Sequence, residues 1–193
     1  MEHWFNLIPL LLLAAGGVAL LAFDDLLISL GGLAATYLGA FFLLVQIEPI
    51  GLALVKLVTG LMAVGLIFVS RQNVPEIPRE SSLASRIFRI TALALVWLVI
   101  FLSAGSFRQI FPLNYETLAG SLITVSAALL VLGTSGNGLR ITLGILAIYA
   151  SFDILYSSLE SSILINGLLS LIVMLIALIG VYISTRHESE YEE

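Results

Sequence analysis

The sequence predicts an all-α integral membrane protein, a single-domain bundle of seven transmembrane helices. Three observations predict this fold class. Of the 193 residues, 60% are hydrophobic and only 11% are charged, whereas soluble domains carry about 25% charged residues. The mean hydropathy is +1.11, so too few polar side chains exist to cover a surface that faces water. The apolar runs are long and continuous, unlike the short alternating segments of a membrane β-barrel.

A membrane span needs about 20 apolar residues to cross roughly 30 Å of hydrocarbon. Seven segments meet this requirement or come close to it: 5–23, 26–47, 50–70, 88–106, 117–133, 140–158 and 162–184. The first segment lacks the basic start of a secretory signal, so we expect it to be a retained helix.

Short polar segments separate these spans in chain order. Asp24 and Asp25 lie between the first and second spans, and Pro49 opens the third, where proline is tolerated. The stretch RQNVPEIPRESS is the one substantial hydrophilic loop, and it precedes the fourth span. GTSGNG separates the fifth and sixth spans, and SLESS separates the sixth and seventh. These tight turns predict that successive helices are antiparallel neighbours.

The arginines predict the orientation of the bundle. With seven spans, six arginines fall on one side of the membrane and one, Arg108, on the other; the six are Arg71, Arg79, Arg86, Arg89, Arg140 and Arg186. Because basic residues favour the cytoplasmic side, we expect the N-terminus outside and the C-terminus in the cytoplasm. The predicted organisation is a seven-span domain over 1–185 and an acidic cytoplasmic tail over 186–193. We expect an integral protein of the plasma or inner membrane of a prokaryote.

Small residues at four-residue spacing predict where helices pack closely, because burying leucine among lipid chains gains little. Gly31, Ala35 and Gly39 form such a stripe on the second span, and Gly120, Thr124 and Ala128 form one on the fifth. We expect these stripes to be packing seams. No repeat between the two halves of the chain is evident, so the sequence does not support an inverted-repeat transporter.

The sequence lacks the residues that several kinds of metal, cofactor and catalytic site require. The chain has no cysteine, and its two histidines, His3 and His187, lie near the termini, so we expect no metal site and no cofactor. No phosphate-binding loop, HExxH or CxxC motif is present, and we expect no enzyme activity. The net charge of −5, largely from the C-terminal ESEYEE, argues against nucleic acid as a partner. The expected partners are the lipid bilayer and other membrane subunits.

Two ionisable side chains lie well inside the predicted spans, Lys56 and Asp153. A charge at the centre of a membrane helix costs about 2.5 to 3.5 kcal/mol. Both residues fall roughly 8–9 Å below the outer interface, at 1.5 Å per residue, and their charges are opposite. We therefore predict that they face each other or share a water-filled cavity.

This pair has more than one interpretation. It is either a structural ion pair, a lysine that extends its ammonium to the headgroups, or a proton or cation relay. Tyr149 and Ser157 share one helical face with Asp153, which favours the relay, and Thr59 lies near Lys56. Three glutamates at the predicted outer rim are either solvated or form an acidic mouth that attracts cations: Glu48, Glu116 and Glu160.

Two stretches resemble the small antiporter-associated membrane subunits of complex I-type assemblies: the K subunit of complex I, its antiporter counterpart, and the E-type subunit of energy-converting hydrogenases. In VKLVTGLMAVGLIFVSRQNVPEIPRESS, the residues at the E-type positions are Lys56, Arg71, Pro75 and Pro78. In LRITLGILAIYASFDILYSSL, the arginine and glycine that open a core helix are Arg140 and Gly144. K-type subunits carry mid-helix glutamates that this chain lacks, and Asp153 is the residue that could substitute.

The resemblance implies a small integral subunit of an energy-coupling membrane complex that assists proton or cation translocation. In this hypothesis Asp153 carries the proton, Lys56 is its charge partner, and Tyr149 and Ser157 supply hydrogen bonds. Two alternatives stay open: a non-conducting assembly or scaffold protein, and a stand-alone carrier of a small solute.

Overall fold

The computed structural model describes residues 2–71, 82–110, 114–159 and 162–189. Within these ranges the chain forms seven α-helices and no strand: α1 (Glu2–Ala22), α2 (Leu26–Leu44), α3 (Ile50–Arg71), α4 (Leu83–Ile110), α5 (Tyr115–Thr134), α6 (Gly138–Ser157) and α7 (Ile163–Ser189). The predicted all-α class is confirmed. Among the described residues, α2 to α7 each contain a segment long and apolar enough to cross a membrane, and α1 contributes a shorter apolar stretch, Leu7–Ala22. α7 continues to Ser189, into the segment expected to be a tail.

The helix starts follow local capping chemistry. Asp25 caps α2, because its side chain accepts hydrogen bonds from the backbone N–H groups of Leu27 (2.8 Å) and Ile28 (3.3 Å). Asn137 caps α6 in the same way, with its side-chain oxygen 3.1 Å from the N–H of Leu139. Pro49 precedes α3, and its carbonyl accepts the first hydrogen bond of that helix from Leu52.

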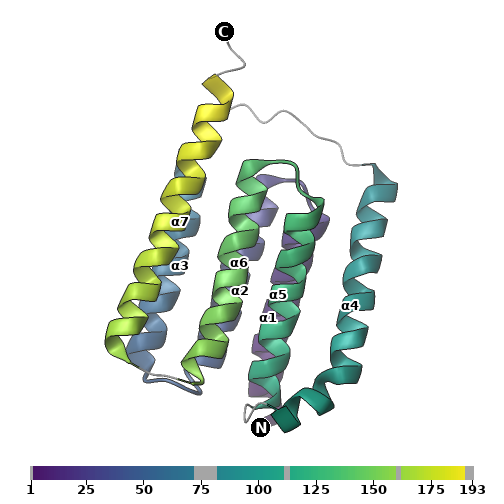
Figure 1. Ribbon diagram of the computed structural model, residues 1–193, viewed down its shortest axis with the longest axis vertical. Coiled ribbons are helices and arrows are strands. Elements are labelled where there is room, and N and C mark those ends of the chain that lie inside the picture. The colour runs from purple at the N-terminus through teal and green to yellow at the C-terminus, as the bar shows by residue number, and fades with distance from the viewer. Residues whose placement is uncertain (1, 72–81, 111–113, 160–161, 190–193) are drawn as a thin grey trace.

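The helices form two layers of three, with α4 outside them. One layer is α1, α2 and α3, and the other is α5, α6 and α7 (Figure 1). Helix α1 packs against α5, α2 against α6, and α3 against α7, while α4 packs against α5 and α1 at one edge. Because successive helices alternate in direction, the facing helices of the two layers run in the same direction. The layers are therefore two parallel three-helix units joined through α4.

The two units repeat with a nearly constant interval along the chain. Helix α6 begins 112 residues after α2 (138 against 26), and α5 ends 112 residues after α1 (134 against 22). The interval also relates the two capping residues, Asp25 and Asn137. It relates identical residues on α2 and α6 as well: Leu27 and Leu139, Gly32 and Gly144, Ala35 and Ala147, Tyr37 and Tyr149, Leu43 and Leu155.

The expectation of no repeat between the halves was therefore wrong. The two units correspond mainly in where their helices begin and end and in a few packing residues. Such a correspondence is hard to detect in a sequence where most residues are apolar. The units are parallel, so an inverted repeat remains unsupported.

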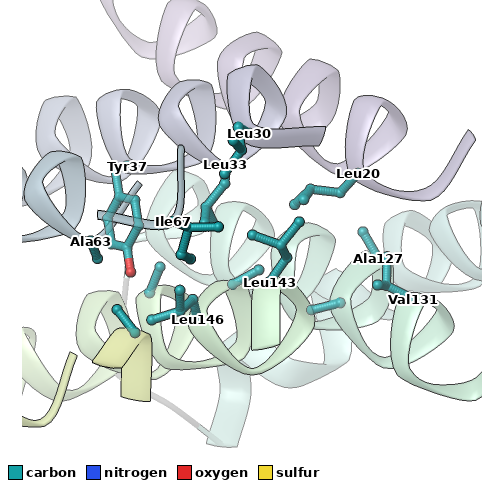
Figure 2. Packing of buried hydrophobic residues seen from close by; sticks show 14 of the residues in the cluster. Leu20, Leu30, Leu33, Tyr37, Ala63, Ile67, Ala127, Val131, Leu143 and Leu146 are labelled. Carbon is teal, nitrogen blue, oxygen red and sulfur yellow. The ribbon is translucent and has the colours of Figure 1, made fainter. Parts of the chain in front are cut away.

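The main core lies between the two layers. Leu33 from α2, Ile67 from α3 and Leu146 from α6 are fully buried there, and Figure 2 shows their side chains converging. On the outer side of the bundle, large apolar side chains are exposed, for example Leu54 on α3 and Leu171 on α7. Such surfaces suit a bilayer rather than water, which supports an integral membrane protein.

Glycines allow the closest helix contacts. A Cβ at Gly32 would lie 2.9 Å from the carbonyl oxygen of Gly16 and 2.8 Å from Ala19 Cβ, so α1 and α2 approach through their backbones. The stripe on α5 is confirmed as a packing seam, because Gly120, Thr124 and Ala128 are all buried.

The stripe predicted on α2 was partly wrong. Gly39 does pack, against Leu13, but Gly31 is exposed and a Cβ there would meet nothing within 4 Å. The seam uses the adjacent glycine, Gly32, which rotates the packing face by one residue. Glycine spacing alone does not distinguish a face that packs from a face that meets lipid.

Candidate ion-relay site

The structure brings Lys56 and Asp153 together. The Lys56 Nζ atom, from α3, lies 3.0 Å from Oδ1 of Asp153, from α6. The side chains are 5% and 13% exposed, respectively. The predicted pairing of these two residues is therefore confirmed, and it joins the two three-helix units across the layer interface. The ammonium points into the protein, so the alternative in which it extends to the headgroups is wrong.

A second carboxylate shares the same ammonium. Oε2 of Glu48 lies 3.2 Å from Lys56 Nζ, and the Glu48 side chain is fully buried. Glu48 stands in the turn between α2 and α3, directly before Pro49, and its carboxylate lies near the N-terminus of α3, where a negative charge is favoured. The expectation that Glu48 is a rim glutamate was therefore wrong. The tight turn folds this side chain inward rather than toward solvent.

Two uncharged groups complete the cluster. Lys56 Nζ donates a hydrogen bond to Oγ of Ser157, which is buried at the end of α6. The side-chain amide of Asn166, on α7, donates to Oε1 of Glu48 over 3.1 Å, and Asn166 is 2% exposed. Ser157 was predicted as part of the site and contacts its lysine. Asn166 was missed, although an asparagine three residues into an apolar span was a visible signal.

The other two rim glutamates are not part of the described cluster. Glu116 lies in the first turn of α5 and is partly exposed. Glu160 lies outside the described residues. The acidic mouth therefore stays a prediction for these positions.

A small cavity continues from the ion cluster into the bundle. Its walls include Lys56 and Asp153, and its volume is about 10 Å³, close to the space that the centre of one water molecule requires. Four helices each contribute one hydroxyl-bearing residue to its walls: Tyr37, Thr59, Tyr149 and Ser170.

Three of these four hydroxyls are buried and have no hydrogen-bond partner among the described protein groups: those of Tyr37, Tyr149 and Ser170. Thr59 instead donates to the carbonyl of Val55 over 2.7 Å. Tyr149, predicted as a site residue, thus lies beside Asp153 along the cavity wall. Tyr37 was missed, and its equivalence to Tyr149 in the repeat was the signal that could have found it.

A second ionic cluster lies at the opposite end of the bundle. Asp24, between α1 and α2, pairs with Arg89 of α4 (2.8 Å) and with Arg140 of α6. Arg140 also donates to the carbonyl of Leu20 over 2.8 Å, at the end of α1. This cluster ties both three-helix units to α4, and an apolar core separates it from the cluster around Lys56.

The chemistry available at the Lys56 cluster is ion binding and proton exchange. Glu48 and Asp153 carry two negative charges when ionised and Lys56 carries one positive charge, which leaves a net charge of −1 among the described groups. An uncompensated charge is costly inside a membrane, so binding of one proton or one cation stabilises the cluster.

No protein family, curated protein or solved structure matches the chain.

Proposed function

We propose that this chain is an integral membrane protein that translocates protons or monovalent cations, with the cluster of Lys56, Asp153 and Glu48 as its ion-relay site. One observation carries the proposal: a buried ammonium shared by two buried carboxylates, at 3.0 and 3.2 Å. A purely structural ion pair needs one carboxylate. The second one creates a site that gains stability when it takes up a positive charge.

In this proposal all seven helices span the membrane, with the N-terminus outside and the C-terminus in the cytoplasm. The Lys56 cluster then opens toward the outer side, and the Asp24 cluster lies toward the cytoplasm, where basic residues are favoured. Asp153 is the group that exchanges the proton, because it borders both the ammonium and the cavity. The Lys56 ammonium offsets the negative charge of the Asp153 carboxylate. Ser157 and Tyr149 supply hydroxyl groups one helical turn after and one turn before Asp153.

We further propose that the chain works as a subunit of a larger energy-coupling membrane complex. The sequence resemblance of the Lys56 and Arg140 segments to antiporter-associated subunits supports this assignment. The large apolar side chains exposed along α4, such as Leu95 and Leu102, fit equally a lipid or a membrane-protein neighbour. Purification in mild detergent distinguishes these two neighbours, since a subunit brings other membrane proteins with it in fixed proportion.

A second candidate function is a stand-alone carrier of a small solute. The repeat favours it, because parallel repeats in known carriers place the substrate site at the interface between the repeated units. Here the Lys56 cluster and the cavity lie at that interface. The purified chain alone would then transport in proteoliposomes, whereas a subunit requires its partners.

The test of the relay is Asp153→Asn in membrane vesicles from cells that produce the variant in place of the parent chain. Proton or cation flux is followed with a pH-sensitive or ion-sensitive dye. We expect the flux to be lost, because asparagine has no exchangeable carboxyl proton. Asp25→Asn is the matched control, since asparagine caps a helix as well as aspartate does. Unchanged flux in Asp153→Asn, with normal protein levels and assembly, contradicts the relay and leaves the scaffold interpretation.

A further inference from the structure

The cavity beside Asp153 has features that a structural ion pair does not require. It lies where α2, α3, α6 and α7 meet, and its walls carry Tyr37 and Tyr149 at equivalent positions of the two repeats. Tyr37 is 6% exposed. Figure 2 shows Tyr37 extending away from α2 across the layer interface, with its hydroxyl on the far end of the ring.

The residues Tyr37, Tyr149 and Ser170 line the same cavity, and their hydroxyls need hydrogen-bond partners. A buried hydroxyl without a hydrogen bond is unfavourable, and these three all lack a partner among the described protein groups. A cavity of about 10 Å³ with at least two polar walls meets the requirements for one ordered water.

We infer that this cavity binds one water molecule, which hydrogen-bonds to Tyr37, Tyr149 and Ser170 and connects them to the Asp153 carboxyl. The water extends the polar path from the end of the bundle to its middle. Along α6 the path passes from Ser157 to Asp153 to Tyr149, which is about 12 Å at 1.5 Å per residue. Beyond Tyr149 the lining of the cavity ends, and the hydrophobic cluster that contains Leu33 and Leu146 follows.

The cluster and the water together form a half-channel that ends near the middle of the bundle. This inference rests on the proposed relay function and deepens it, since it names how a proton moves beyond Asp153. When Asp153 releases its proton, its O–H bond breaks as a new O–H bond forms to the water. The hydroxyls of Tyr37, Tyr149 and Ser170 accept hydrogen bonds from the hydronium that results. This hydronium becomes neutral water again when it gives a proton to the Asp153 carboxylate, and no electron is transferred.

The first test uses Tyr37→Phe and Tyr149→Phe in the vesicle flux assay. Each change keeps the ring and removes one hydrogen-bonding group. We expect proton flux to fall by roughly tenfold, which corresponds to about 1.4 kcal/mol, of the order of one hydrogen bond. Tyr156→Phe is the matched control on the same helix: its ring stacks on Phe152 and is not part of the cavity wall, so flux should be unchanged.

The second test is direct observation of the water in a high-resolution crystal structure of the parent protein. We expect one water peak within hydrogen-bonding distance of the Tyr37 and Tyr149 hydroxyls, and its loss in the double Phe variant. No peak in the parent protein, or hydroxyls bonded directly to protein groups, overturns the inference.

The two proposals fail in different ways. If Asp153→Asn abolishes flux while both Tyr variants keep full flux, the relay stands and the water path is overturned. If Asp153→Asn leaves flux intact, the relay function itself is overturned, whether or not the crystal structure shows a water in the cavity.

Discussion

Lys56 Nζ lies 3.0 Å from Oδ1 of Asp153, although one residue belongs to the first three-helix unit and the other to the second. The contact therefore does more than fix two neighbouring helices in register. It joins the two repeated units at one end of the bundle, as the contact of Asp24 with Arg140 joins them at the other end. The two ends of the layer interface are ionic, and a hydrophobic cluster lies between them.

Replacing Lys56 by methionine should destabilise the protein. The change removes the ammonium and leaves Glu48 and Asp153 buried side by side without a cation, and breaking a buried pair in this way costs about 3–5 kcal/mol. The free energy of unfolding in mixed detergent micelles measures the loss. Adding Asp153→Asn to Lys56→Met should restore part of the stability, because one unpaired carboxylate is then gone.

The control for this prediction is Val58→Met, at a position on α3 that is 52% exposed. It introduces the same side chain on the same helix and should change stability little. Equal stability of Lys56→Met and Val58→Met would show that the cluster contributes nothing to the fold.

Replacing Asp24 by asparagine should weaken the attachment of α4. Arg89 and Arg140 both pair with this carboxylate, so its loss leaves two guanidinium groups without an anionic partner, at a cost of about 3 kcal/mol. The adjacent change Asp25→Asn should be neutral, because Asn is an equally good N-cap. Thermal unfolding of the two variants in detergent gives the comparison, and similar midpoints for both contradict the assigned role of Asp24.

Replacing Gly60 by alanine should displace Tyr37. A Cβ at Gly60 would clash with the Tyr37 ring, so α3 and α2 must separate or the ring must move, at about 1–3 kcal/mol for an overpacked site. We expect lower stability and lower ion flux together, because Tyr37 forms part of the cavity wall.

The matched control is Gly65→Ala on the same helix. A Cβ there would meet nothing within 4 Å, and alanine gains about 0.5–1 kcal/mol over glycine inside a helix. Gly65→Ala should therefore be neutral or stabilising. A Gly60→Ala protein as stable and as active as Gly65→Ala contradicts the close contact between α2 and α3.

The proposed orientation is testable because the chain has no native cysteine. Gly136→Cys places a thiol at the exposed turn between α5 and α6, and Leu159→Cys places one at the exposed turn after α6. In intact cells a membrane-impermeant maleimide should label Leu159→Cys, and it should label Gly136→Cys only after permeabilisation. The reverse pattern inverts the bundle and places the Lys56 cluster on the cytoplasmic side.

The sequence by itself determined the helical class, the order of the helices, and the depth of Lys56 and Asp153. The depth of a residue follows from the number of residues between it and the end of its helix. The helix starts are marked by Asp25, Pro49 and Asn137, because capping and proline effects depend only on nearby residues. Opposite charges at equal depth in lipid have a strong reason to meet, which is why the pairing could be predicted.

Only the tertiary structure decided which face of each helix packs, and therefore which side chains join the pair. In a soluble helix the apolar stripe marks the inner face, but in this chain the outer face is apolar as well. Gly31 and Gly32 look alike in the sequence, yet only Gly32 packs. For the same reason the sequence did not assign Asn166 and Tyr37 to the site: their contacts depend on how α2 and α7 are rotated against the other helices. Glu48 joins the site because the turn between α2 and α3 directs its side chain inward.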